Sequence, residues 1–138
     1  MLEISCGTIP FTIKNNEIYY LLIKDAKGVC GFPKGHIEEN ETEEMTALRE
    51  TEEETSIILK LLDGFKTDTT YLMPNGIYKK VIYFLGEFSN QTPKQKEGFE
   101  QFDFLLLPFN KAYEALSYDN TKSLFVKANN FLIKTLNK

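Results

Sequence analysis

The pattern of apolar and polar positions changes its period several times along the chain. Residues 4–13 and 18–24 are rich in β-branched and aromatic side chains, and Asn15 and Asn16 between them are typical of a turn. Residues 57–62, 78–88 and 102–107 are further apolar runs of strand length, while Gly28, Gly31, Pro33 and residues 73–76 interrupt the pattern. These runs predict a series of strands separated by turns.

Two segments follow a helical period instead. Asn40 is expected to cap a Glu-rich helix that runs to about Ser56, with Glu43 as its capping-box partner. Pro108 is suited to open a second helical region, which is expected to continue to Lys138. Its apolar face recurs mostly at steps of three and four residues: Leu116, Leu124, Phe125, Ala128, Phe131, Leu132 and Leu136. Strands interleaved with helices indicate an α/β fold, with helices on both faces of a mixed sheet.

Composition narrows the class of protein. The 138 residues, 42% hydrophobic and 26% charged, predict one domain over residues 1–138. A net charge of −4 gives no reason to expect a long nucleic acid as partner. The two cysteines lack metal-ligand spacing, and no run reaches the roughly 18 apolar residues of a membrane span. We therefore expect a cytoplasmic protein that does not enter membranes and is a monomer or weak dimer.

The predicted Glu-rich helix carries an unusual concentration of negative charge. Glu50, Glu53 and Glu54 lie at positions i, i+3 and i+4 and share one face. Each like-charge pair at this spacing costs on the order of 0.2–0.5 kcal/mol, so a cation is expected there. Mg²⁺ suits carboxylate oxygens, and Mn²⁺ is an alternative. The competing interpretation is an acidic face that merely contacts water.

The spacing around these glutamates resembles the Nudix box. Seven positions match it: Gly35, Glu41, Arg49, Glu50, Glu53, Glu54 and Ile57. Thr51 stands where an apolar residue is usual, and Ser56 replaces a glycine. Ser56→Gly is expected to be tolerated or mildly stabilising if residue 56 has a positive φ. The resemblance implies a Nudix fold, which is an α/β/α sandwich, and hydrolysis of phosphoanhydride bonds.

Shorter motifs resemble one group within that family, the asymmetric bis(5′-nucleosyl)-tetraphosphatases. They are Cys6 with Gly7, residues 33–36, residues 46–51, and residues 64–66 and 81–83 in the next two strands. The resemblance implies cleavage of a dinucleoside tetraphosphate, such as diadenosine tetraphosphate, to a mononucleotide and a nucleoside triphosphate. The group usually carries two tryptophans where this chain has Cys30 and Leu106. Recognition of the base then depends on Tyr71, Tyr78, Tyr83 or Tyr118.

The predicted site combines the charge of the Glu-rich helix with the resemblance to the Nudix box. Arg49 is expected to hold a ligand carboxylate, Glu52 or Glu53, in position, and the distal Glu100 is a further metal ligand or base. The predicted catalytic residues are Arg49, Glu53, Glu54 and Glu100, with the general base left open among the three glutamates. The predicted metal ligands are Gly35, Glu50, Glu53, Glu54 and Glu100. The predicted substrate contacts are Lys34, His36, Lys79, Lys80, Tyr83 and Tyr118.

Two other functions stay open at this point. One is 5′-pyrophosphate removal from RNA, or hydrolysis of another nucleoside diphosphate derivative, and the acidic chain disfavours long RNA. The other is a non-catalytic module that binds a nucleotide without cleaving it. A complete set of box glutamates disfavours such a module.

Overall fold

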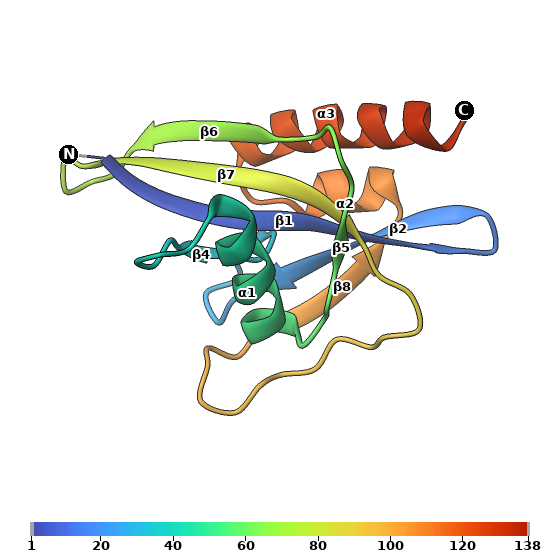
Figure 1. Ribbon diagram of the computed structural model, residues 1–138, viewed down its shortest axis with the longest axis horizontal. Coiled ribbons are helices and arrows are strands. Elements are labelled where there is room, and N and C mark those ends of the chain that lie inside the picture. The colour runs from blue at the N-terminus through green and yellow to red at the C-terminus, as the bar shows by residue number, and fades with distance from the viewer. Residues whose placement is uncertain (1, 138) are drawn as a thin grey trace.

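The computed structural model describes residues 2–137 and contains one mixed sheet between two layers of helix (Figure 1). The strands are β1 (Leu2–Lys14), β2 (Glu17–Lys24), β3 (Cys30–Gly31), β4 (Lys34–His36), β5 (Lys60–Leu61), β6 (Thr67–Leu72), β7 (Tyr78–Glu87) and β8 (Asp103–Leu107). The helices are α1 (Glu43–Thr55), α2 (Phe109–Ala115) and α3 (Asp119–Leu136). Every helix within residues 2–137 is too short or too polar to cross a bilayer.

The long first strand organises the sheet. β1 pairs antiparallel with β2 and β4 and parallel with β7, and β7 in turn pairs with β5 and β6. Asn15 and Asn16 connect β1 to β2 at φ values of 53° and 64°. Asparagine tolerates this left-handed conformation, which two-residue hairpin turns require. The turn predicted between the first two strands is therefore confirmed.

Side chains on the two faces of the sheet form separate cores. Along β7, Tyr83 and Leu85 pack with Phe125 of α3, whereas Ile82 packs with Ala47 of α1. Successive strand residues point to opposite faces, so one strand supplies both layers. Figure 1 shows α1 on one side of the sheet and α2 and α3 on the other. The predicted α/β fold with both faces covered is confirmed.

The start of α1 differs from the prediction. Thr42 is the N-cap, and its hydroxyl accepts a hydrogen bond of 3.1 Å from the Met45 amide. Asn40 has a φ of 68°, whereas an N-cap residue needs extended backbone. Glu43 is already helical, so the expected capping box of Asn40 and Glu43 is wrong. The helix ends at Thr55 with Ser56 as C-cap, as predicted.

Three other segments also differ from the prediction. Only Lys60 and Leu61 of residues 57–62 form a strand, because Ile57 and Leu59 are buried beneath the end of α1 instead. β6 begins at Thr67, after residues 64–66, where a strand was expected from the resemblance. The region after Pro108 is two helices rather than one, because residues 116–118 leave the helical conformation.

Candidate active site

Strand β4 pairs with β1 and lies against the second half of α1. The Thr8 amide donates a hydrogen bond of 3.1 Å to the Pro33 carbonyl. A Cβ on Gly7 would overlap that carbonyl and lie 2.7 Å from the Cβ of Lys34. Glycine at position 7 therefore permits the close approach that places residues 34–36 beside the glutamates of α1.

Two glutamates of α1 contact this short strand. The Glu54 carboxylate accepts a hydrogen bond of 3.0 Å from the Lys34 amide. Glu50 lies directly against Gly35, where any Cβ would overlap its carboxylate. The glycine that the Nudix box requires is thus the residue that makes room for the first glutamate of the acidic face.

Arg49 links the box glutamates to one another. It donates to both oxygens of Glu41, at 2.7 and 3.0 Å, and to Glu53 at 3.0 Å. Glu50 lies 3.5 Å from the same guanidinium, and the His36 carbonyl accepts a further hydrogen bond of 3.1 Å. The bond from Arg49 lowers the pKa of Glu41 to about 2. Arg49 thus holds Glu53 but not Glu52, which pairs with Lys96.

The acidic face is short of positive charge. Burial, followed by repulsion from Glu50, raises the pKa of Glu54 to about 8, and Glu100 contributes further repulsion. Burial and the charge of Glu53 also raise the pKa of Glu50. Raised pKa values in a group of neighbouring carboxylates mean that their charged forms lack counter-charge. A bound cation would supply it.

The donor set fits a hard divalent cation. Glu50, Glu53 and Glu54 offer only oxygen ligands, and Gly35 has no side chain to obstruct Glu50. Within residues 2–137, no group of three or more histidine, cysteine, aspartate or glutamate side chains is arranged to hold a metal ion by itself. Mg²⁺ is usually bound through one or two carboxylates, with water and substrate phosphate completing its coordination. An open carboxylate face is therefore consistent with such an ion.

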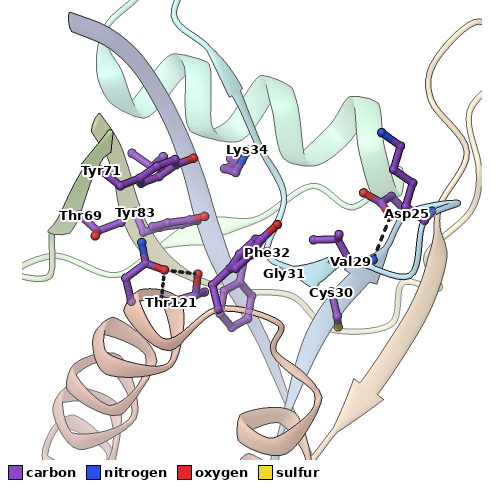
Figure 2. Close-up of a pocket in the computed structure, with 14 residues that line it drawn as sticks. Asp25, Val29, Cys30, Gly31, Phe32, Lys34, Thr69, Tyr71, Tyr83 and Thr121 are labelled. Carbon is purple, nitrogen blue, oxygen red and sulfur yellow. Dashed lines mark hydrogen bonds between the residues drawn. The ribbon is translucent and has the colours of Figure 1, made fainter. Parts of the chain in front are cut away.

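A cavity of about 580 Å³ lies beside the carboxylate face of α1 (Figure 2). Its walls include Phe32, Tyr71, Tyr83 and Tyr118, and Lys34 lies at its edge. Figure 2 shows Tyr71 and Tyr83 one above the other, with both hydroxyls directed toward the side where Lys34 and Phe32 lie. Aromatic walls with a cation at one end suit a flat ring that carries a negative substituent.

Strand register explains which predicted residues reach this cavity. Gly7 of β1 is paired with Lys34 on one side and with Tyr83 on the other. Paired residues point to the same face of a sheet, so Lys34 and Tyr83 lie on one face. Lys79 lies four residues before Tyr83 in β7 and points to the same face of the sheet. Burial of the Lys34 side chain and the charge of Lys79 lower the pKa of Lys34. Two of the predicted lysines therefore lie close together.

Of the other predicted contacts, Lys80, His36 and Tyr78 lie outside the cavity, whereas Tyr118 lines it. Lys80 points to the opposite face of β7, that of Ile82 and α1, so the structure does not bring it to the other lysines. The His36 ring is exposed and lies 3.7 Å from Glu3. Tyr78 is also exposed, at the far end of β7. Tyr118 lines the cavity from the N-cap of α3.

Glu100 approaches Glu54 from the loop that precedes β8. Both residues line a second cavity of about 220 Å³, and Lys34 lies in its wall. Lys34 and Phe32 also line the larger cavity, so the aromatic cavity and the cavity with Glu54 and Glu100 share part of their walls. The structure therefore brings together the predicted Lys34, Glu54 and Glu100.

Some residues of the site were not predicted as site residues from the sequence. Phe32 and Thr69, which line the large cavity, were not singled out, and Glu41, which was noted only as a match to the box, is the main partner of Arg49. Thr67, Thr69 and Tyr71 are more buried than their neighbours in β6, but the sequence of this strand does not alternate between apolar and polar residues, so no local pattern marked this face. Phe32 is adjacent to the predicted loop at Pro33, and its aromatic character was the available signal.

Comparison with known proteins is consistent with this geometry. The family model described as NUDIX domain matches residues 5–127. The chain therefore belongs to the Nudix family, and it is an enzyme of the pyrophosphohydrolase class. Nudix hydrolases generally use divalent metal ions.

Its relatives include the asymmetrical bis(5′-nucleosyl)-tetraphosphatases. The protein of Rattus norvegicus is 30% identical over 142 residues, covering 95% of this chain and 96% of the rat protein. That of Sus scrofa is 29% identical and covers 93% and 94% of the two chains. A crystal structure of a Caenorhabditis elegans Ap4A hydrolase binary complex shares the fold, with a TM-score of 0.87 at 23% identity over 96% of this chain and 98% of that one.

Proposed function

We propose that the enzyme hydrolyses dinucleoside tetraphosphates, with diadenosine tetraphosphate as a substrate, to a mononucleotide and a nucleoside triphosphate. The observation that carries this proposal is the pair of neighbouring cavities that share Lys34. One has aromatic walls that would contact a nucleoside, and the other is lined by Glu54 and Glu100, which would take part in phosphoanhydride cleavage. The asymmetrical tetraphosphatases among its relatives support the same substrate class.

Each part of the site would have a separate task. The base would lie against the aromatic side chains of Phe32, Tyr71, Tyr83 and Tyr118. Lys34 and Lys79 would bind the phosphate chain where it extends out of the aromatic cavity. His36, on the exposed side of β4, is a further candidate phosphate contact. Lys80 is left out of the proposal because it points to the other face of the sheet.

The carboxylates would hold Mg²⁺ or Mn²⁺ and accept a proton. Glu50, Glu53 and Glu54, with Gly35 beside them and Glu100 opposite, are the proposed ligand group. When bound, the metal would neutralise phosphate charge and lower the pKa of a water molecule. Arg49 would keep Glu53 and Glu41 in place. Glu54 or Glu100 would accept the proton of the attacking water, and pH–rate profiles of Glu54→Gln and Glu100→Gln would distinguish them.

Product analysis tests the proposal. The purified protein with Mg²⁺ is incubated with diadenosine tetraphosphate and, separately, with a 5′-triphosphorylated RNA. We expect equal amounts of AMP and ATP from the dinucleotide and little release of pyrophosphate from the RNA. Turnover of the RNA alone would overturn the proposal in favour of a 5′-pyrophosphohydrolase.

A binding module without catalysis is the alternative from another class. Binding of the dinucleotide without any product, at every Mg²⁺ concentration, would support it. Three further expectations stay predictions: one domain over residues 1–138, a cytoplasmic location, and a monomer or weak dimer.

A further inference from the structure

The segment between β7 and β8 runs past the C-terminal end of α1 before it reaches β8 (Figure 1). We call residues 88–102 the Glu100 loop. Among the hydrogen bonds of residues 2–137, none involves the side chain of Glu100. The position of its carboxylate beside Glu54 therefore depends on how the loop itself is held.

The first attachment uses the serine that replaces the box glycine. Ser56 has a φ of 65°, and its hydroxyl donates a hydrogen bond of 2.9 Å to the Lys94 carbonyl. The Lys94 amide donates in turn to the Thr55 carbonyl at 2.9 Å. A glycine would adopt this φ with less strain but could not make the first bond. The departure from the box thus adds a contact between α1 and the Glu100 loop.

The second attachment is made by one side-chain amide. Gln91 accepts a hydrogen bond of 2.8 Å from the Ile58 amide and donates one of 2.8 Å to the Ile58 carbonyl. This pairing satisfies both polar groups of an exposed backbone residue. The Lys96 ammonium adds a contact of 3.4 Å to Glu52 on α1. The first half of the loop is therefore attached at three points, at or just beyond the end of α1.

The second half of the loop is closed on itself. The Gln101 side chain donates to the carbonyls of Lys96 and Phe99, at 3.2 and 3.0 Å. Gln95 donates to the Phe102 carbonyl at 2.9 Å. Glu100 lies inside this closed turn, between the attached first half and the buried Phe102 that precedes β8, so the attachments of the first half fix one of the two ends that place its carboxylate.

We propose that Ser56 and Gln91 are positioning residues that hold Glu100 at the carboxylate face. The role in turnover rests on the proposed function, whereas the attachment of the loop does not. Ser56 and Gln91 act through the loop, and neither lines either of the two cavities.

The test uses Ser56→Gly, Gln91→Ala and their combination. Thr92→Ala is the matched control, because Thr92 is exposed in the same loop and has no hydrogen bond recorded for its hydroxyl. Amide hydrogen exchange is measured on the metal-free proteins, together with thermal melts. We expect exchange at the amides of Ile58 and Lys94, whose hydrogen bonds join the end of α1 to the loop, to be at least about tenfold faster in the double variant, with exchange in the sheet unchanged. The control is expected to match the wild type.

Kinetics on diadenosine tetraphosphate with Mg²⁺ then test positioning. We expect kcat of the double variant to fall about tenfold while KM changes less than about twofold. In a Glu100→Gln background the same substitutions should cause no further loss, since the residue that they position is already neutral. A purely structural role would give additive losses and a higher KM.

Three results would overturn the proposal, and they differ from a failure of the proposed function. Unchanged exchange in the double variant would show that these residues do not hold the loop. Faster exchange with wild-type kcat, or additive losses with Glu100→Gln, would show that holding the loop does not position Glu100. If the wild type does not cleave the dinucleotide at all, the proposed function fails, whereas the exchange data still decide whether the loop is attached.

Discussion

Thr51 stands in the box where an apolar residue is usual, and the structure gives it a buried partner. Its hydroxyl lies 2.6 Å from the hydroxyl of Thr8, and both residues have 0% exposure. Thr51 also donates a hydrogen bond of 2.8 Å to the Ala47 carbonyl. Since a hydroxyl has one proton, Thr8 must donate to Thr51. The pair therefore joins β1 to α1 directly behind Glu50.

This arrangement predicts strongly coupled stability changes. Thr51→Val leaves the Thr8 hydroxyl buried without an acceptor, which costs about 1–3 kcal/mol. Thr8→Val leaves Thr51 with its bond to Ala47, so the expected cost is about 1 kcal/mol. Replacing both leaves two isosteric apolar side chains in contact and no unpaired group, so the double variant is expected within about 1 kcal/mol of the wild type. The coupling free energy is then about 2 kcal/mol.

Urea unfolding of the wild type, the two single variants and the double variant, with linear extrapolation to water, measures this double-mutant cycle. Thr12→Val, at another buried threonine of β1 with no recorded side-chain hydrogen bond, is the control. It is expected to change the free energy of unfolding by less than about 1 kcal/mol. Additive effects of Thr8→Val and Thr51→Val would refute the reasoning.

The remaining predictions concern the carboxylates and the aromatic cavity. Because the folded protein raises the pKa of Glu54 to about 8, the folded state binds the proton more tightly, and the metal-free protein should lose stability as the pH rises toward 8. Thermal melts in EDTA should show this slope in the wild type and not in Glu54→Gln, and parallel curves would contradict it. Gly35→Ala places a methyl group on the Glu50 carboxylate, so kcat should fall about a hundredfold with a small change in melting temperature. Tyr118→Ala should raise KM for the dinucleotide about tenfold and leave kcat within about twofold, with Tyr118→Phe near the wild type; a fall in kcat alone would place Tyr118 outside the base site.

Much of the fold was predictable because local signals were strong. Asn15 with Asn16 identified the first hairpin, and the residues around Pro108 identified the change from strand to helix. The first residue of α1 could not be predicted from the sequence, because Asn40 and Thr42 are both good capping residues. Only the left-handed backbone of Asn40, which depends on the turn before the helix, excludes it.

The candidate site was predictable to the extent that its residues lie in one motif. The box gave the spacing of Glu50, Glu53 and Glu54. Of the two partners predicted for Arg49, Glu53 is confirmed and Glu52 is wrong, and the additional partner Glu41 lies in the chain just before α1. The separation of Lys79 from Lys80 follows from strand alternation, once β7 is known to supply both faces. The roles of these residues in turnover stay predictions.

The assembled aromatic cavity required tertiary structure. Tyr71, Tyr83 and Tyr118 come from two strands and a helix N-terminus, and no spacing in the sequence relates them. Cys30, at a position where the related group usually has a tryptophan, is buried near them. Pairing between strands, which the sequence does not encode locally, brings these side chains together.

The most direct test of the account is the Mg²⁺-dependent cleavage of diadenosine tetraphosphate by the wild type, Glu53→Gln, Glu54→Gln and Glu44→Gln. Glu44 is an exposed glutamate in the first turn of the same helix, so its variant controls for loss of charge. We predict that the wild type and Glu44→Gln release AMP and ATP, and that the other two variants lose about a hundredfold or more in kcat. Equal losses in all three variants, or a wild type that binds the dinucleotide and leaves it intact, would contradict the claim that this carboxylate face carries out hydrolysis.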